Sequence, residues 1–277
     1  LQREFTGNSF HLHTYIGVYE IRDRDEAVRI MVDKANIAAD TIKNNYDCCV
    51  AYYDEHLLEI SIEQRRLLGE FEPALQNAEF VMYLQPQVKR DGAAKGAEAL
   101  VRWVHPSRGI LTPYAFIDIL ENAGLIYKLD LYIWEKAAQK LAEWKEKGYG
   151  SYHISVNIST KDFYIIDIYE TFTGLINKYG IAASNLHLEI TETTLMTDFE
   201  KNMNIIHKLQ NVGFRMEIDD FGSGYSSLNM LKDISADVLK IDMGFLRKSE
   251  NEVKGQDILE SIIALAGKIG MDVITEG

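Results

Sequence analysis

The sequence has few cysteines, no long apolar run and a shortage of positive charge, and each feature excludes a class of protein. Its two cysteines, Cys48 and Cys49, are neighbours. Adjacent cysteines seldom form a structural disulfide, so there is neither a disulfide framework nor the CxxC spacing of a metal site. No apolar run approaches the roughly 20 residues of a membrane-spanning helix, and no signal-peptide pattern is present. We expect a cytoplasmic protein, with any tether to the inner membrane supplied by sequence upstream of Leu1.

The balance of charge is strongly acidic. Lys and Arg number 29 against 42 Asp and Glu, which gives a formal net charge of −13 and a pI of about 5.0. An acidic surface argues against a protein that binds long nucleic acid, because such binding relies on basic side chains that displace counterions from the phosphates. It allows a small anionic ligand, provided that bound cations or a few local basic side chains supply positive charge.

The length and composition are those of an ordinary globular chain. The 277 residues are 47% hydrophobic and 26% charged, which suits one large α/β domain, alone or with a smaller unit. Residues 10–19 alternate like a strand, residues 25–46 have apolar side chains at helical spacing, and a second long helical pattern covers 54–80. This N-terminal unit is too small to form much of a core alone.

From about residue 79 onward, strand-like runs alternate with helical segments, and glycine closes several of the helices. Seven strand candidates cover residues 79–88, 96–104, 152–159, 185–191, 213–219, 236–242 and 271–275. This alternation predicts βαβ units and a mainly parallel sheet. We expect an α/β protein with a TIM (β/α)8 barrel, which has eight strands in about 250 residues, its last strand and helix lying beyond Gly277. A doubly wound open sheet is the competing architecture.

Polar and charged side chains recur where these predicted strands end. Because the carboxyl ends of parallel strands meet on one face, residues as far apart as Glu98 and Glu276 are expected to come together there. The set is Glu98, Asn157, Glu189, Glu192, Asp219, Asp220, Lys240, Asp242 and Glu276. It contains carboxylates, one amide and one lysine, but no cysteine and no histidine.

Oxygen ligands of this kind suit Mg²⁺, Mn²⁺ or Ca²⁺ rather than Zn²⁺. Two such ions about 3.5–4 Å apart need a bridging carboxylate plus ligands for each ion, and the pair promotes phosphoryl transfer. In that interpretation one of the adjacent residues Asp219 and Asp220 bridges the ions and the other holds the second ion. The alternative is that polar strand ends are simply solvated, and that the two aspartates supply turn and helix-cap chemistry. Recurrence at five strand ends favours a metal site, although the pattern alone leaves both interpretations open.

Several motifs occur in a fixed order between residues 72 and 277. They are YLQP (83–86), GAEALVRWVHPSRG (96–109), SVNIS (155–159), LEITET (188–193), DDFGSGYSSLNML (219–231), LKID (239–242) and ITEG (274–277). On these motifs the chain resembles the EAL domain of bacterial cyclic-di-GMP phosphodiesterases, and motifs in this order are far more specific than a lone glycine-rich turn. The resemblance implies an EAL-type TIM barrel that hydrolyses cyclic di-GMP to linear pGpG with two Mg²⁺ or Mn²⁺ ions.

The resemblance also implies roles for individual residues. Glu98, Asn157, Glu189 and Asp219 would bind one metal ion, and Asp219 and Asp220 would hold the other. A set built from several strand ends is what the polar pattern alone indicates, whereas this division of ligands between two ions comes from the family.

Further residues match the family's catalytic and substrate positions. Lys240 would contact or orient the attacking water, and Glu276, the first Glu of an EGVE-type motif, would bind a metal or hold water. Glu192 would stabilise the loop that follows the aspartate pair. Arg102 would contact a substrate phosphate, which suits a guanidinium fork, and Gln85 would line the substrate pocket.

The chain departs from the family at two places. The family continues into VE, a Gln and a final strand, beyond Gly277, and the Gln that usually follows VNxS is replaced around Lys161 and Asp162. The first departure leaves open whether this chain closes its barrel and turns over substrate. The alternative function is a catalytically inactive cyclic-di-GMP receptor, although such receptors lose metal ligands and this chain retains those it is long enough to contain.

The N-terminal residues resemble, more weakly, the C-terminal end of a degenerate GGDEF (diguanylate cyclase-like) domain, through IGVYEI (16–21) and VDKANIAADTIKNNY (32–46). The resemblance implies three parts. They are 1–56, the C-terminal part of a GGDEF-like domain; 57–78, a helical linker; and 79–277, the EAL domain. An upstream sensor domain is a further expected partner.

Two other features have simple interpretations. His11 and His13 form an HxH pair that could bind a metal, but on an alternating strand they are more often structural. The aromatic stripe of residues 114–134 is most simply helix core, with a homodimer face as the alternative.

Overall fold

A computed structural model of the chain describes residues 14–43, 48–89, 91–221, 236–242 and 252–276. It divides into two compact units, Leu1–Glu72 and Pro73–Gly277, which are described separately. No helix among the described residues is long and apolar enough to cross a membrane. His11 and His13 and the predicted helix at 225–234 lie outside the described residues.

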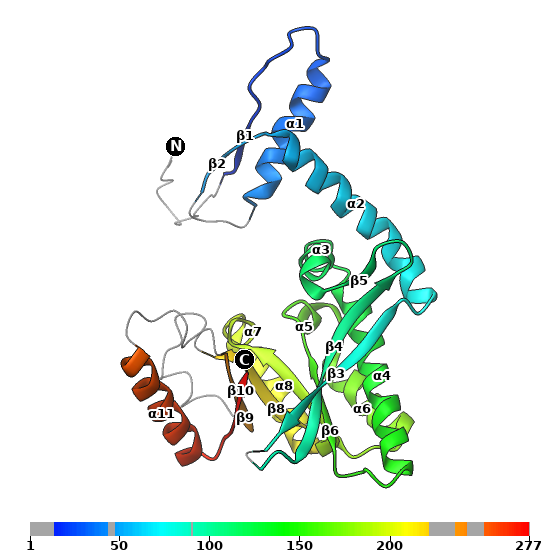
Figure 1. Cartoon of the computed structure of the whole chain (residues 1–277), viewed down its shortest axis with the longest axis vertical. Helices are drawn as coiled ribbons and strands as arrows, with labels where there is room; N and C mark the ends of the chain where they lie inside the picture. Colours follow the sequence, from blue (N-terminus) through cyan, green and yellow to red (C-terminus); the bar gives the residue numbers. More distant parts are fainter. Residues whose placement is uncertain (1–13, 44–47, 90, 222–235, 243–251, 277) are drawn as a thin grey trace. The chain divides into compact units, whose positions relative to one another are not determined.

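The first unit is a small βαβ arrangement (Figure 1). Its elements are β1 (Ile16–Val18), α1 (Val28–Thr41), β2 (Val50–Tyr52) and the start of α2 (Glu55–Gln76). Strands β1 and β2 pair in parallel, with Gly17 opposite Ala51. A Cβ on Gly17 would lie only 1.7 Å from the Ala35 carbonyl oxygen, so glycine is what lets α1 pack directly on the strand. The strand β2 was not predicted, and the expected strand at 10–19 is described only from residue 14.

The second unit is built on a curled sheet that contains all seven predicted strands. They are β3 (Phe80–Val88), β4 (Ala94–His105), β6 (His153–Asn157), β7 (Leu186–Thr191), β8 (Arg215–Phe221), β9 (Val238–Asp242) and β10 (Asp272–Glu276). Their order in the sheet is β10-β9-β8-β7-β6-β4-β3, and the short β5 (Gly109–Leu111) pairs with β4. Neighbours from β4 to β10 run parallel, whereas β3 and β5 are antiparallel to β4.

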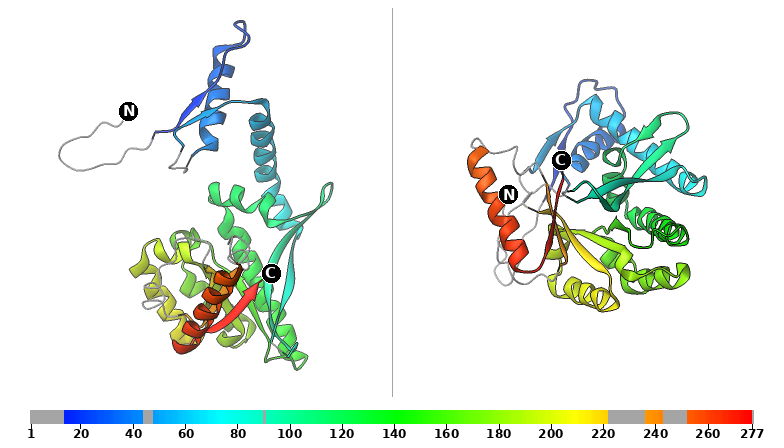
Figure 2. Two further views of the ribbon diagram at one scale, coloured as in Figure 1. Left: turned by 60° about the vertical axis from the view of Figure 1, so that its left-hand side comes forward. Right: turned by 60° about the horizontal axis from the view of Figure 1, so that its bottom comes forward.

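Helices connect the strands and cover the outer side of the curl (Figure 2). They are α3 (Ile117–Asn122), α4 (Ile126–Glu146), α5 (Asp162–Ile165), α6 (Ile168–Tyr179), α7 (Glu192–Met196), α8 (Phe199–Val212) and α11 (Glu252–Lys268), with 3₁₀ turns η1 (Pro113–Ala115) and η2 (Ala183–Asn185). Within the described residues, β3 and β10 are the two edges of the sheet and do not pair with each other. The expected mixed α/β fold is confirmed, with a sheet that is curled and open.

A layer of buried aromatic side chains packs between the sheet and its helices. The rings of Trp103 and Phe80 contact each other at a tilt of 34°, with centroids 4.8 Å apart. The rings of Trp134 in α4 and Phe172 in α6 have centroids 4.5 Å apart. Trp134 also donates a hydrogen bond from Nε1 to the Asn157 carbonyl oxygen, 2.9 Å away. This bond ties α4 to the end of β6, where the polar residues begin. The aromatic stripe thus contributes to the core, although Tyr114 at its start is 98% exposed.

Candidate functional site

A lysine and three carboxylates from four strands meet on the concave side of the sheet. The Lys240 Nζ of β9 lies 3.1 Å from Glu98 Oε2 of β4, 3.1 Å from Glu189 Oε2 of β7 and 3.2 Å from Asp219 Oδ1 of β8. Strands β9 and β4 are not neighbours, so this contact requires the curl of the sheet. Asn157, at the end of β6, donates from Nδ2 to Glu98 Oε1 over 3.4 Å.

The cluster is buried and carries excess negative charge. Lys240 is 1% exposed and Glu189 is fully buried, and a buried charge is tolerated only when it is paired and hydrogen-bonded. One ammonium cannot balance three ionised carboxylates. The carboxylate oxygens of Glu98, Glu189 and Asp219 all lie within 4.8 Å of one another, which is the arrangement that a small cation with oxygen ligands requires.

Burial changes the ionisation of one of these carboxyl groups. Desolvation raises the pKa of Glu189 well above its usual range, and the Lys240 ammonium opposes this only in part. Its register partner on β8 is Glu217. Desolvation acts on Glu217 in the same direction, but hydrogen bonds from His187 and from Glu189 lower the pKa of Glu217 to about 2. The pKa values of these two neighbouring glutamates are thus shifted in opposite directions.

The two adjacent aspartates form a β-bulge in β8. Between the pairs Ile218–Leu239 and Phe221–Ile241, β8 has two residues where β9 has one. Asp220 adopts φ 56°, a left-handed conformation that Asp tolerates better than most residues. Asp219 is half-buried beside Lys240, whereas Asp220 is exposed, and the Asp220 backbone N–H donates to Asp219 Oδ1 over 2.9 Å.

The remaining predicted residues lie around this cluster. Gln85 of β3 is directly opposite Glu98 of β4 and is exposed. Arg102 is on the same face as Glu98, four residues further along β4, half-buried, with its guanidinium carbon 5.8 Å from the centre of the Tyr83 ring. Glu192 begins α7 directly after β7.

Two predicted positions can be placed only by their backbone. Glu276 pairs with Asp242 where β10 and β9 end, and both side chains are outside the described part of the chain. The glycine- and serine-rich segment after Phe221, which Glu192 was expected to stabilise, also lies outside it.

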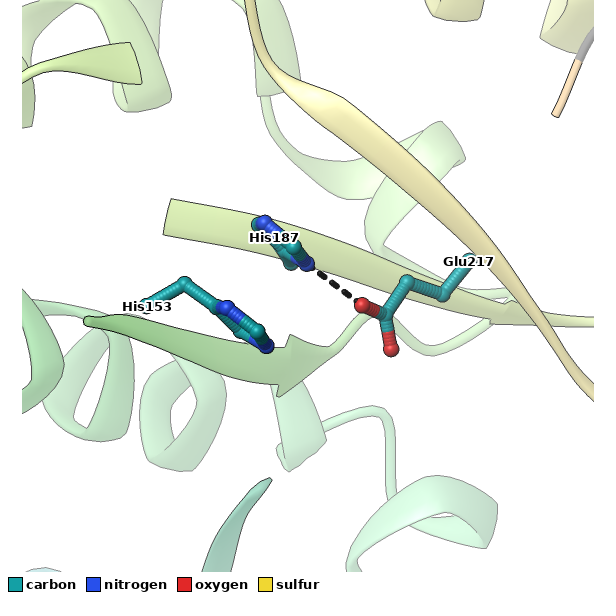
Figure 3. A group of neighbouring side chains, drawn as sticks. All are labelled: His153, His187 and Glu217. Carbon is teal, nitrogen blue, oxygen red and sulfur yellow. Dashed lines mark hydrogen bonds and ion pairs between the residues drawn. The ribbon is translucent and has the colours of Figure 1, made fainter. Parts of the chain in front are cut away.

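A second polar cluster, which the sequence analysis missed, lies earlier along the same strands. Figure 3 shows His153 of β6, His187 of β7 and Glu217 of β8 side by side. The two imidazole rings stack with centroids 3.8 Å apart and an interplanar angle of 3°. His187 Nδ1 is 2.5 Å from Glu217 Oε1. A signal was present, because His187 and Glu189, like Glu217 and Asp219, are two apart and must share a face of their strand.

The comparisons with known proteins agree with one another. A sequence profile of the EAL domain matches residues 69–277. The bifunctional diguanylate cyclase/cyclic di-GMP phosphodiesterase MucR of Pseudomonas aeruginosa is 32% identical over 241 residues, which cover 87% of this chain and 35% of that protein. The cyclic di-GMP phosphodiesterase PdeR of Escherichia coli is 31% identical over 204 residues, 74% of this chain and 31% of that protein.

A solved structure is similar as well. The PaMucR phosphodiesterase in complex with c-di-GMP superposes with a TM-score of 0.72 at 33% identity, covering 76% of this chain and 86% of that one. The curled sheet is thus of the kind found in that structure. This chain spans only 40%, 35% and 32% of the length of the first curated relatives that it matches.

Proposed function

The chain belongs to the EAL domain family, and on that premise we propose that it hydrolyses cyclic di-GMP to linear pGpG with two divalent cations, Mg²⁺ or Mn²⁺. The observation that carries the proposal is the group of three carboxylates within 3.2 Å of Lys240 Nζ. Relatives named as cyclic di-GMP phosphodiesterases, about one third identical to this chain, support the choice of substrate.

The donor set fits the cations that the proposal requires. Glu98, Asn157, Glu189 and Asp219 would hold one ion, and Asp219 with Asp220 the other. All of these offer oxygen, the ligand that Mg²⁺ and Mn²⁺ prefer. Glu189 Oε1 is buried and accepts no N–H or hydroxyl hydrogen bond among the described residues. Bound at this place, such ions stabilise negative charge on a phosphoryl group and make a nearby water more nucleophilic.

The side chains of the protein have complementary tasks. Lys240 holds the carboxylates together when no cation is bound, and with substrate present it would hold the attacking water and neutralise a phosphoryl oxygen. Burial raises the pKa of Glu189 and a ligand carboxyl binds a cation in its ionised form, so cation affinity would rise with pH. The Arg102 guanidinium would bind a phosphate of the substrate, and Gln85, opposite Glu98, would line the pocket beside it.

The remaining assignments follow from the family. Glu276 would bind a cation or hold water at the end of β10, and Glu192 would steady the segment after the aspartate pair. We propose residues 1–56 as the C-terminal part of a GGDEF-like domain, 57–78 as a helical linker and 79–277 as the phosphodiesterase domain. The βαβ arrangement of β1, α1 and β2 supports the first of these.

Product analysis tests the proposal. Purified protein is incubated with cyclic di-GMP and Mg²⁺ or Mn²⁺, and the products are separated by chromatography and identified by mass spectrometry. We expect linear pGpG, and no product when a chelator removes the cations. Tight binding of cyclic di-GMP without any linear product would overturn the proposal in favour of a receptor.

A further inference from the structure

We propose that His153, His187 and Glu217 form a second metal site, for a borderline divalent cation such as Zn²⁺, distinct from the oxygen-ligand cluster around Lys240. The three residues precede Asn157, Glu189 and Asp219 along β6, β7 and β8. It stands independently of the proposed function.

The three side chains come from consecutive strands and share one level of the sheet interior. His153, His187 and Glu217 are 5%, 3% and 0% exposed, and each offers one ligand atom within 4.8 Å of the other two. They converge from β6, β7 and β8 (Figure 3). Buried polar side chains are costly unless they are hydrogen-bonded or bind a ligand.

The ligand chemistry differs from that of the Lys240 cluster. Two imidazoles and one carboxylate form a ligand set of Zn²⁺ sites that leave a fourth position open, whereas Mg²⁺ prefers oxygen alone. The two clusters therefore select different cations.

The surroundings of His153 support a ligand role. Gln87 Oε1 lies 2.7 Å from His153 Nε2, and Gln87 Nε2 donates to Ser155 Oγ over 3.4 Å. This orientation of the Gln87 amide makes its oxygen the acceptor of an Nε2–H, which leaves the lone pair on Nδ1. A second hydrogen bond of this kind is typical of histidines that bind metals. Gly96 makes room for the ring, since a Cβ there would lie 2.4 Å from His153 Nε2.

Cation binding requires a defined rearrangement. The nitrogen lone pairs of an imidazole lie in the plane of the ring, and the planes of His153 and His187 are parallel, so the two rings must tilt relative to each other to share an ion. With Zn–N distances of about 2.0–2.1 Å, tetrahedral ligand atoms lie about 3.3 Å apart. The 2.5 Å contact between His187 Nδ1 and Glu217 Oε1 must therefore open slightly. Binding has a structural signature, the loss of the imidazole stack.

Metal titration tests the proposal directly. The protein carries Cys48→Ser and Cys49→Ser, which removes both thiols, and a chelator first strips it of bound metal. It is then titrated with Zn²⁺ in competition with a chromophoric chelator, in the presence of excess Mg²⁺. We expect one tightly bound Zn²⁺ per chain. His153→Leu and the shape-conserving Glu217→Gln should each weaken binding at least about tenfold. His56→Ala is the matched control, because His56 is an exposed histidine of α2, and it should leave binding unchanged.

Two results would overturn the site. One is the absence of tight Zn²⁺ binding, or binding that His153→Leu and Glu217→Gln leave unaltered. The other comes from Zn K-edge X-ray absorption of the wild-type protein, which needs no variant to fold. Two imidazole ligands and no sulfur support the site, whereas sulfur scattering at about 2.3 Å would assign the ion to the cysteine pair instead.

Discussion

Lys240 Nζ lies 3.1 Å from Glu189 Oε2 in the interior of the sheet, where both side chains are almost completely buried. The ammonium occupies the centre of a group of carboxylates and so takes the place of the positive charge that a cation supplies. Removal of one member of a buried ion pair leaves the other charge without compensation. The stability and the chemistry of this site are therefore linked through one side chain.

Replacement of Lys240 by Met should destabilise the cation-free protein strongly. Breaking a buried pair costs about 3–5 kcal/mol, and added Mg²⁺ or Mn²⁺ should restore part of the loss by binding the freed carboxylates. Urea denaturation with and without the cation measures both effects. Lys95→Met is the control, because Lys95 pairs with Asp272 at the exposed surface over 3.4 Å and should cost less than about 1 kcal/mol. Equal losses in the two variants would contradict the expectation.

A buried pair of aspartates should make stability fall as pH rises. Desolvation, then the charge of Asp162, raises the pKa of Asp130 well above its usual range, and desolvation also raises the pKa of Asp162. The folded state therefore holds a proton that the unfolded state has already lost. The contribution of this pair to stability is therefore fully present below the ordinary carboxyl pKa of about 4 and declines as pH rises through the folded-state values.

The variant Asp162→Asn tests this pH dependence. An amide at this position can still accept the hydrogen bond that the Ser159 N–H donates to Asp162 Oδ2 over 2.8 Å. The decline in unfolding free energy between pH 5 and pH 8 should be smaller in the variant, and the exposed Asp118→Asn serves as control. An unchanged slope in Asp162→Asn would show that the pair does not share a proton.

The conformation of Asp220 should lower the stability of the protein, whereas its side chain should contribute to activity. Because Asp220 has φ 56°, Asp220→Gly should relieve strain and stabilise the protein by up to about 1 kcal/mol. The same change removes a proposed cation ligand and should lower turnover of cyclic di-GMP. Asp220→Asn, which tolerates the same backbone conformation, separates the loss of charge from the relief of strain. A Gly variant that retains full turnover would argue against a ligand role for Asp220.

Substitution of Arg102 should affect substrate binding more than the chemical step. Loss of a charge-assisted hydrogen bond to phosphate costs about 1.5–3 kcal/mol, so Arg102→Ala should raise KM about tenfold or more, with a smaller effect on kcat. Arg102→Lys should recover part of the loss, since it restores charge without the fork. Arg66→Ala, exposed on α2, is the control. An unaltered KM in Arg102→Ala would remove Arg102 from the phosphate contacts.

Sequence patterns predicted the strands well because their apolar, β-branched runs are local features. The direction of each strand and the strand with which it pairs were harder to predict from the sequence. The antiparallel pairing of β3 with β4 follows from the short connection between Val88 and Ala94, which allows only a hairpin, a feature that the search for βαβ units overlooked. The three-residue strands β2 and β5 are too short to produce a recognisable alternation.

The candidate site was predictable as a group but not in its details. Strand-end carboxylates meet for a topological reason, so Glu98, Glu189 and Asp219 could be expected together. The bulge that turns Asp220 outward depends on the register against β9, which no local pattern reveals. His187 and Glu217 were missed because the search considered only strand ends, although each lies two residues before a predicted ligand and so shares its face of the strand.

Turnover of cyclic di-GMP by the wild-type protein and by Asp219→Asn, in Mg²⁺ or Mn²⁺, tests the central claim most directly. The variant keeps the size of the side chain but removes the charge that lies 3.2 Å from Lys240. The account predicts linear pGpG from the wild type and a kcat at least about a hundredfold lower in the variant, with circular dichroism showing an intact fold. Equal turnover in both proteins would contradict it.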